Sequence, residues 1–212
     1  MKLFYTSSVC SLAVRIILHE LGITCEYESV NLKTKKTERG TDYLNINPKG
    51  SVPALLISND EVLTENAVIL QFLADKYNAT ELLPSIGDMK RYRVLEWLNF
   101  VSTDLHRYCA PLFWSKFSEE NKKDLFLPIL KNKLIFVDNH LKDNKFLMGN
   151  SFTLADSYLL VILIWLAKLK IKMKEWPNLL RYFMDMRERP SIRQAIEEEG
   201  LMNLLNDYDK NI

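Results

Sequence analysis

Cysteine is scarce in this chain of 212 residues, which has three copies at positions 10, 25 and 109. The number is odd, and neither a CxxC pair nor a cysteine–histidine cluster with zinc-ligand spacing is present. These absences argue against a disulfide framework and a structural metal site, so we expect free thiols, a reducing compartment and no bound metal.

Long apolar runs and an excess of one charge are also missing. The longest apolar run, residues 158–167, is too short to span a bilayer and is typical of a buried core helix. The first residues lack the apolar stretch of a signal peptide, so we expect a cytoplasmic protein. With 28 Lys and Arg against 27 Asp and Glu, the net charge of +1 gives no reason to expect nucleic acid or a membrane as a partner.

Two parts of the chain differ in pattern. Up to Tyr77, strand-like segments alternate with helix-like segments, and after residue 88 the apolar spacing is helical. Residues 78–88 contain proline and glycine and lack periodicity, which indicates a linker. We therefore predict an α/β domain over residues 1–77, a linker over 78–88 and an all-helical domain over 89–212.

The first part is expected to form a small sheet with helices packed against it. Its expected elements follow the order β, α, β, variable segment, β, β, α, and they cover Lys2–Tyr5, 11–21, 27–32, 53–57, Val62–Thr64 and 65–77. Residues 58–61 are rich in turn formers, so the strands on either side are expected to pair as a hairpin.

The second part is expected to contain only helices. The first should bury one apolar stripe formed by Met89, Tyr92, Leu95, Leu98, Val101, Leu105 and Tyr108. Further helices are expected over 125–141, 153–170, Pro177–Arg187 and 191–199. Thr153 followed three residues later by Asp156 indicates a helix start, and the polar residues 202–212 are expected to be loosely held.

Cys10 stands where the first expected strand leads into the first expected helix. The positive end of the helix dipole and the unpaired backbone N–H groups there favour a thiolate, the reactive form. A buried, inert core cysteine is the alternative interpretation. The position that would hold a second, resolving cysteine is Ala13. A reactive Cys10 therefore works as a single thiol whose partner comes from solution, and the obvious partner is glutathione.

Residues 47–55, with the sequence NPKGSVPAL, place a proline at the start of an expected strand. Pro53 cannot donate to a sheet ladder. A cis Val52–Pro53 bond would leave the N–H and C=O of Val52 free to pair with the backbone of a ligand. The simpler alternative is that Pro53 only begins an edge strand.

Glu65 and Asn66 follow the next expected strand and open a helix. A helix N-terminus attracts carboxylates, so Asn66 and the backbone N–H groups suit a carboxylate while Glu65 suits an ammonium group. Together they match the α-amino-acid end of a ligand. An ordinary cap with an acid in the first turn is the alternative.

In this order and spacing, these features resemble the glutathione transferase family over essentially the whole chain, and most closely its bacterial beta class. The resembling stretches are residues 1–5, 10–13, 47–55, 63–65, 96–100, 105–106 and 152–156. The resemblance implies a thioredoxin-like N-terminal domain (βαβ–ββα), an all-α C-terminal helical bundle and a homodimer. It also implies an enzyme that uses glutathione as cosubstrate and conjugates it to hydrophobic electrophiles.

The resemblance assigns the glutathione-binding residues. Val52, before a cis-Pro53, would bind the cysteinyl backbone, and Lys35 would reach the glycyl carboxylate. Glu65 and Asn66 would hold the γ-glutamyl end. The family commonly has Ser where this chain has Asn66, but an amide still donates to a carboxylate. Asn99 would contact the glutathione of the neighbouring subunit.

The resemblance also assigns the reacting groups. Cys10 would lie beside the glutathione sulfur, with a mixed disulfide as one outcome, and His106 would approach from the helical domain as a proton acceptor or donor. Most other classes use a tyrosine or serine near the first helix. Because Tyr5 and Ser11 are present, a serine-type mechanism through Ser11 stays open.

Aromatic residues near His106 are candidates for the wall of an electrophile pocket, with core packing as the alternative. They are Tyr108, Phe113, Trp114 and Trp165. Arg107 is expected to hold glutathione or an anionic product. Three functions remain open: conjugation, Cys10-dependent disulfide exchange or peroxide reduction, and a non-catalytic binding or regulatory protein of the same fold.

Overall fold

The computed structural model describes residues 1–58 and 61–210. Its first part is a five-stranded mixed sheet with the strand order β3-β2-β1-β4-β5. The central strand β1 runs parallel to β2 and antiparallel to β4, and β4 pairs with β5 as the expected hairpin. The strands are β1 Lys2–Tyr5, β2 Glu26–Asn31, β3 Lys36–Thr37, β4 Ala54–Leu56 and β5 Val62–Thr64. Asn59 and Asp60 of the expected turn lie outside the described residues.

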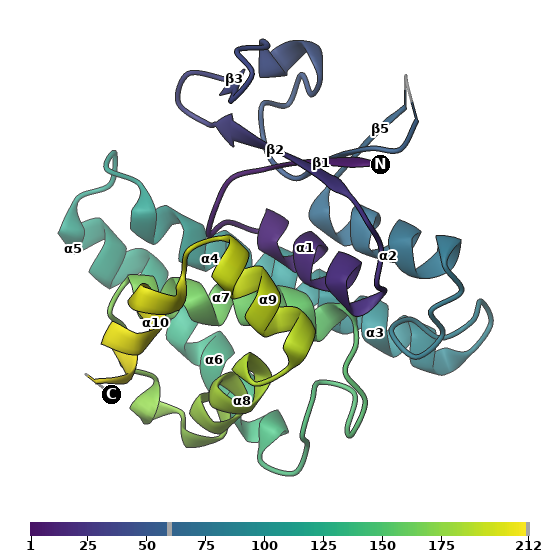
Figure 1. Cartoon of the computed structure of the whole chain (residues 1–212). Helices are drawn as coiled ribbons and strands as arrows, with labels where there is room; N and C mark the ends of the chain where they lie inside the picture. Colours follow the sequence, from purple (N-terminus) through teal and green to yellow (C-terminus); the bar gives the residue numbers. More distant parts are fainter. Residues whose placement is uncertain (59–60, 211–212) are drawn as a thin grey trace.

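Helices α1 (Ser11–Glu20) and α2 (Asn66–Lys76) lie between the sheet and the helical part (Figure 1). The helical part contains α3 Met89–Phe100, η2 Val101–His106, α4 Arg107–Cys109, η3 Ala110–Phe113, α5 Glu119–Asn121, η4 Lys122–Phe126, α6 Leu127–Leu141, α7 Leu154–Lys168, η5 Met173–Glu175, α8 Pro177–Arg187, α9 Pro190–Glu198 and α10 Met202–Asp209. A 3₁₀ turn, η1 (Tyr43–Asn45), completes the first part. The expected fold class, a thioredoxin-like α/β domain followed by an all-α domain, is confirmed.

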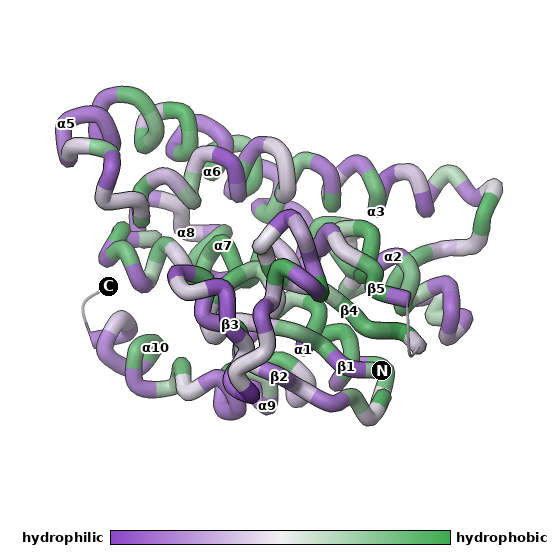
Figure 2. Tube along the Cα trace, turned by 90° about the horizontal axis from the view of Figure 1, so that it is seen from above, coloured by the Kyte–Doolittle hydropathy of each residue, from purple (hydrophilic) through white to green (hydrophobic). Residues whose placement is uncertain are grey.

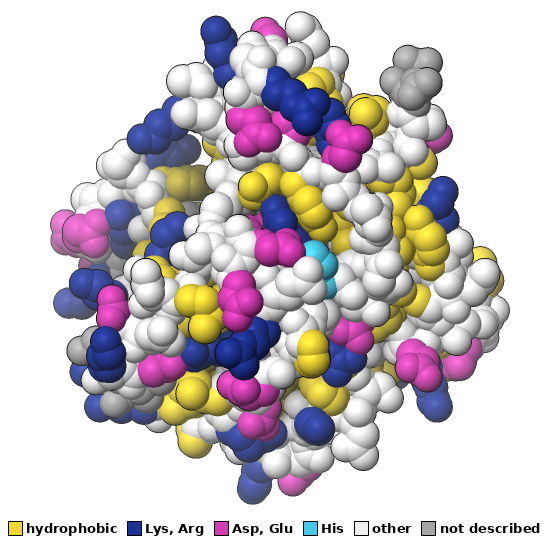
Figure 3. Space-filling view, in the orientation of Figure 1, with side chains coloured by type: hydrophobic (Ala, Val, Ile, Leu, Met, Phe, Trp, Pro, Cys, Tyr) yellow, Lys and Arg dark blue, Asp and Glu magenta, His cyan; other side chains and the backbone are white. Residues whose placement is uncertain are grey.

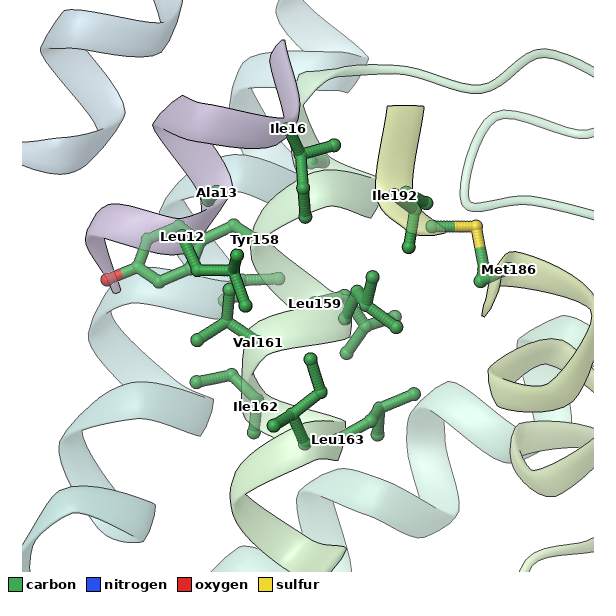
Figure 4. Close-up of a cluster of buried hydrophobic side chains, with 14 of the residues drawn as sticks. Leu12, Ala13, Ile16, Tyr158, Leu159, Val161, Ile162, Leu163, Met186 and Ile192 are labelled. Carbon is green, nitrogen blue, oxygen red and sulfur yellow. The ribbon is translucent and has the colours of Figure 1, made fainter. Parts of the chain in front are cut away.

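Helix α7 forms the centre of the molecule. Every residue from Leu154 to Ala167 is buried, as expected for an apolar run of this length. Helix α1 packs against α7 and α9, and Figure 4 shows Leu12 and Ile16 of α1 facing the α7 side chains, with Ile192 of α9 close by. Apolar residues concentrate along β1, β4 and α7 (Figure 2). One continuous core therefore joins the sheet side to the helical side.

Two expectations about the helical part are wrong. Met89 and Tyr92 were expected in the buried stripe, but their exposed fractions are 66% and 51%. The buried stripe instead runs through Val94, Leu98, Val101, Leu105 and Cys109. Residues 202–212 were expected to be loosely held, yet α10 covers Met202–Asp209 and buries Leu205 and Tyr208; residues 211–212 lie outside the described residues.

The surface carries both charges. Acidic and basic side chains are intermixed over the face shown in Figure 3, in keeping with the net charge of +1. No helix within the described ranges is long and apolar enough to cross a membrane. The same ranges hold no group of three or more His, Cys, Asp or Glu side chains placed to bind a metal ion.

The start of α7 depends on one buried carboxylate. Asp156 accepts hydrogen bonds from the N–H and the hydroxyl of Thr153, each at 2.8 Å, which confirms the expected helix start. It also accepts from Leu147 N–H and from the Tyr182 hydroxyl, both at 2.9 Å. Because Asp156 is fully buried, removing its side chain leaves several buried donors without a partner.

We therefore expect unequal losses of stability at this helix start. Thr153→Ala should lower the free energy of unfolding by about 0.5–2 kcal/mol, the usual effect of a lost cap. Asp156→Ala should lower it by roughly 2–6 kcal/mol, because Leu147 N–H and the Tyr182 hydroxyl lose their acceptor. Urea unfolding of both variants, with the exposed Ser151→Ala as control, measures the difference. An Asp156→Ala loss no larger than that of Thr153→Ala would contradict this account.

Candidate functional site

Cys10 lies at the N-terminus of α1, facing the loop that leads into β4. Its thiol donates to the Val52 carbonyl oxygen at an Sγ–O distance of 3.2 Å. The Val52–Pro53 bond is cis, as the family resemblance implied. Cys10 keeps partial exposure as a residue, and its thiol lies between the β1–α1 loop and the cis-proline loop.

Burial works against the thiolate that the helix terminus was expected to favour at Cys10. Burial of the sulfur raises the pKa of Cys10 from 9.0 to about 12, although the backbone N–H groups of Cys10 and Ser11 act to lower it. Desolvation therefore outweighs the helix terminus. At neutral pH Cys10 is a protonated thiol, and a protonated thiol is a hydrogen-bond donor.

Ser11 does not reach the reactive surface. Its side chain is fully buried, its hydroxyl donates to the Thr6 carbonyl at 3.1 Å and accepts from Thr6 N–H at 3.3 Å. Both contacts fix the loop before α1. The serine-type mechanism left open by the sequence is therefore not supported, since this hydroxyl is fully engaged inside the protein.

The cis-proline loop offers an unused backbone donor. In residues 1–58 and 61–210, no group accepts from Val52 N–H. The neighbouring Lys35 has a φ of 56° and donates from Nζ to the Gly50 carbonyl at 2.6 Å. This contact holds the Lys35 ammonium group beside the cis-proline loop. A ligand whose backbone pairs with Val52 would end near that ammonium group.

Glu65 already binds an ammonium group. Its φ of 73° places it in the left-handed region just before α2, a conformation that costs about 1–3 kcal/mol for a non-glycine residue and is common at functional sites. Its Oε1 pairs with Lys49 Nζ at 2.5 Å, with exposed fractions of 61% and 55%. The sequence did not single out Lys49. The Lys49 ammonium group occupies the position in which we expected the amino group of an amino-acid ligand.

Asn66 is buried without a partner. The residue is 7% exposed, and neither Nδ2 nor Oδ1 makes a hydrogen bond with any described residue. The Tyr158 hydroxyl is close enough for the amide to lower the pKa of the phenol, but no hydrogen bond of good geometry joins the two groups. Leaving a buried polar group unpaired costs about 1–3 kcal/mol. An amide held at that cost, at the start of a helix and beside Glu65, suits a ligand carboxylate.

His106 and Tyr158 form a buried pair that closes the site from the helical side. His106 ends the π-helical turn η2, and its Nδ1 lies 2.6 Å from the Tyr158 hydroxyl. Burial lowers the pKa of His106 and raises that of Tyr158, so the imidazole is neutral and the phenol protonated at neutral pH. Coulombic interaction with Cys10 and with Glu65 acts in the same direction and adds to the raised pKa of Tyr158.

Tyr158 is the site residue that the sequence did not reveal. It lies in the apolar run that was expected to be core, and its ring is indeed buried among Leu12 and its neighbours (Figure 4). Only the hydroxyl leaves the apolar cluster. A tyrosine within an otherwise aliphatic run was the available signal, because a buried phenol needs a hydrogen-bond partner.

The expected electrophile wall is only partly assembled. Trp165 packs edge-on against His106 and Phe113, with ring centroids 4.8 Å and 5.7 Å away. Trp114 instead stacks on Phe117, with ring centroids 5.8 Å apart. Tyr108 lies under the Arg107 guanidinium, 6.0 Å from it. The structure therefore brings His106, Phe113 and Trp165 together and places Tyr108 and Trp114 in neighbouring contacts.

Asn99 and Arg107 are exposed, and neither is seen to touch the residues around Cys10. Asn99 lies on α3, one turn before Thr103, whose hydroxyl donates to the Asn99 carbonyl at 3.0 Å. Their expected roles toward glutathione, in the neighbouring subunit for Asn99, stay predictions.

The helical part holds the β1–α1 loop through Ser8. Glu199 accepts from Ser8 N–H at 2.7 Å and from Arg15 Nε at 3.2 Å, and Trp165 Nε1 donates to the Ser8 carbonyl at 2.8 Å. Burial raises the pKa of Glu199 to about 7. These contacts join residues more than 150 positions apart, and they fix the loop two residues before Cys10.

A further hollow lies away from Cys10. A cavity of about 1160 Å³ is lined by the end of α1, the segment after α2 and residues 145–153, with Glu20 and Arg189 among its charged residues. None of the predicted reactive or ligand-binding residues lines it. The candidate site is therefore identified by the side chains and backbone groups around Cys10, and this cavity is not part of it.

The chain is similar in sequence to known proteins. Residues 7–76 match the family described as Glutathione S-transferase, N-terminal domain, and residues 100–190 match Glutathione S-transferase, C-terminal domain. Glutathione S-transferase GstA of Escherichia coli O157:H7 is 40% identical over 201 residues, covering 95% of this chain and all of the relative.

Solved structures agree with this match. The structure of a sphingomonad glutathione S-transferase complexed with glutathione superposes with a TM-score of 0.89 at 40% identity, covering 95% of this chain and 100% of that one. The bacterial beta class glutathione S-transferase of Sphingomonas chungbukensis gives a TM-score of 0.89 at 39% identity, with the same coverage.

The raised pKa of Cys10 predicts slow alkylation at neutral pH. Because only the thiolate reacts, the rate with iodoacetamide should rise about tenfold for each pH unit from pH 7 to pH 9, with no plateau. Peptide mass spectrometry of the modified protein isolates Cys10 from Cys25 and Cys109, and Cys10→Ser supplies the background. A rate that levels off below pH 8 would show that the thiol ionises near neutrality and would refute this prediction.

Proposed function

The chain belongs to the glutathione S-transferase family, and from this membership we propose that it conjugates glutathione to hydrophobic electrophiles in the manner of the beta class. Glutathione is the cosubstrate of this transferase family. What is specific to this chain is how its residues would hold the tripeptide and activate its sulfur.

The observation that carries the proposal is the unpartnered Asn66 amide. At the start of α2 it offers a buried donor beside Glu65, a carboxylate that already holds an ammonium group. A γ-glutamyl end presents a carboxylate and an ammonium group side by side, so it satisfies both. The unused Val52 N–H suits the peptide backbone that follows, and Lys35 suits the glycyl carboxylate.

The sulfur would then lie at the start of α1. The Cys10 thiol, freed from Val52, would donate to it. We assign the Tyr158 hydroxyl as the donor to His106 Nδ1, 2.6 Å away, which is the tautomer that carries the imidazole proton on Nε2. His106 Nε2–H is then a second donor. Donors placed in a water-poor site stabilise a thiolate more strongly than water does. The sulfur attacks the electrophile from this position, with the aromatic rings of Phe113 and Trp165 against the apolar part.

Several finer features belong to the same proposal. The similarity to the Sphingomonas chungbukensis enzyme supports the beta class. A homodimer is proposed because the family resemblance gives Asn99 a role only across two subunits. The three cysteines are free thiols, which supports a reducing, cytoplasmic location.

Disulfide exchange is the second candidate function. Cys10 is partly exposed and lies next to the proposed sulfur position, so it would form a mixed disulfide with oxidised glutathione. Its raised pKa makes this reaction slow at neutral pH. A non-catalytic role is less well supported, because the donors for glutathione are retained.

Cys10→Ala separates the two reactions. We expect conjugation of glutathione to 1-chloro-2,4-dinitrobenzene to persist within about tenfold of the unchanged protein, because His106 and the helix terminus remain. Reduction of a glutathione mixed disulfide should be abolished. His106→Gln tests the other donor and should lower conjugation by about 10²-fold. Loss of conjugation in Cys10→Ala with no effect of His106→Gln would overturn the proposed mechanism.

Asn66→Leu should weaken glutathione binding and stabilise the free protein. Leucine removes the donor to the γ-glutamyl carboxylate, which should raise the Kd for glutathione about 10- to 100-fold. It also removes a buried amide without partners, so the melting temperature without glutathione should rise. Calorimetric titration and thermal unfolding measure both, with Asn66→Ser as the control that keeps a donor. A stability loss with unchanged affinity would show that Asn66 has a structural role only.

A further inference from the structure

A cation without a carboxylate partner lies next to the β1–α1 loop. Lys168 is the last residue of α7, and its Nζ donates to Ser8 Oγ at 2.7 Å. The same ammonium group lies 6.0 Å from the centroid of the Phe113 ring. Throughout residues 1–58 and 61–210, no carboxylate oxygen lies within 4.0 Å of it.

This position adjoins the aromatic part of the site. Ser8 precedes Cys10 by two residues, and its carbonyl accepts from Trp165 Nε1 at 2.8 Å. Trp165 in turn contacts both His106 and Phe113. Lys168 therefore lies at the edge of the Phe113 and Trp165 surface, on the side of the reactive loop.

The other charges near this surface do not neutralise Lys168. Glu199, on the far side of Ser8, is bound to Ser8 N–H and paired with Arg15. Two further cations lie against aromatic rings of the same region: Arg107 at Tyr108, and Lys116 at 4.6 Å from the Trp114 ring centroid. Neither has an ion-pair partner in the described part of the chain.

Glutathione itself has other partners for its anionic groups. In the proposed binding mode its γ-glutamyl carboxylate faces Asn66 and its glycyl carboxylate faces Lys35, both reached from the cis-proline loop and α2. Lys168 belongs to the opposite wall, formed by α7 and Phe113. An anion at Lys168 is therefore more simply part of the second substrate.

We propose that the electrophile used by this enzyme is an aromatic compound with an anionic group, a carboxylate or sulfonate, which pairs with Lys168 while its ring packs on Phe113 and Trp165. This inference rests on the proposed conjugation and names its substrate class. Because Lys168 is exposed, its attraction for an anion is modest and weakens as salt is added. Packing of the ring would bury apolar surface, and pairing of the anion with Lys168 would favour anionic over neutral substrates.

Two electrophiles with the same leaving group test the proposal. 1-Chloro-2,4-dinitrobenzene is neutral, and 4-chloro-3,5-dinitrobenzoate carries a carboxylate. In both reactions a C–S bond forms at the ring carbon, the C–Cl bond breaks, chloride leaves and the thiol proton passes to solvent. The measured quantity is the ratio of kcat/KM for the benzoate to kcat/KM for the neutral compound, each divided by its uncatalysed rate.

The unchanged protein should favour the benzoate. Lys168→Met should lower the ratio about threefold to tenfold, and Lys168→Arg should restore most of it. Added sodium chloride should lower the ratio of the unchanged protein. Lys172→Met removes the same charge from an exposed position and is the matched control. Melting temperatures of all variants show whether each is folded.

Each other outcome overturns the proposal. A ratio that Lys168→Met leaves unchanged shows that the cation does not select the electrophile. A raised KM for glutathione at a constant ratio assigns Lys168 to glutathione instead. If neither electrophile reacts with the unchanged protein, the proposed conjugation fails as well, whereas equal use of both by all variants removes only the substrate class.

Discussion

The packing of α1 against α7 is the contact on which both halves of the site depend. The first turn of α1 follows Cys10, and α7 carries Tyr158 and Trp165, so one apolar interface sets the distance between the thiol and the residues that face it (Figure 4). Burial of aliphatic side chains stabilises such an interface by about 25 cal/mol per Å². Polar contacts of Ser8 with Glu199 and Trp165 then fix the loop itself.

The balance of burial and helix dipole decides the chemistry at Cys10. A helix terminus stabilises an anion by about 0.3–1 kcal/mol, and by up to ~2 when partly buried. Desolvation of the sulfur opposes this effect and raises the pKa of Cys10 to about 12. Burial therefore wins, and Cys10 is a donor. Cys10 and the neutral His106 both offer hydrogen-bond donors. Such a site binds the anionic sulfur of a ligand better than a site in which Cys10 is itself an anion.

Much of the fold could be predicted from the sequence because the patterns that indicate its strands and helices lie within short segments of the chain. The strands around β4 and β5 follow from alternating apolar residues around a turn-rich segment, and the start of α7 from Thr153 and Asp156. The α3 stripe was misplaced because a spacing of three or four residues fits more than one face. The π-helical turn η2 then changes the phase along the helix. Strand β3 has two residues, too few for any pattern.

The sequence predicted the site less completely than the fold, because tertiary packing brings the residues that it missed into the site. Cys10 was singled out by its position before the first helix, whereas the cis-Pro53 and His106 were expected from the family resemblance. Tyr158 lies in a uniformly apolar run, where periodicity cannot show which residue turns its polar end outward. The pairing of Glu65 with Lys49 and the desolvation of Cys10 arise only when separate loops meet. Local sequence predicted which groups are present but not their protonation states.

The most direct test of the central claim is the pKa of the glutathione thiol when it is bound to this protein. Ultraviolet thiolate absorbance, titrated with pH in the Cys10→Ala variant and corrected for the free variant, reports that sulfur alone. Stabilisation by His106 Nε2–H and the start of α1 predicts a pKa well below the ordinary thiol value of about 8.5. A bound thiol that titrates at or above that value would contradict the account.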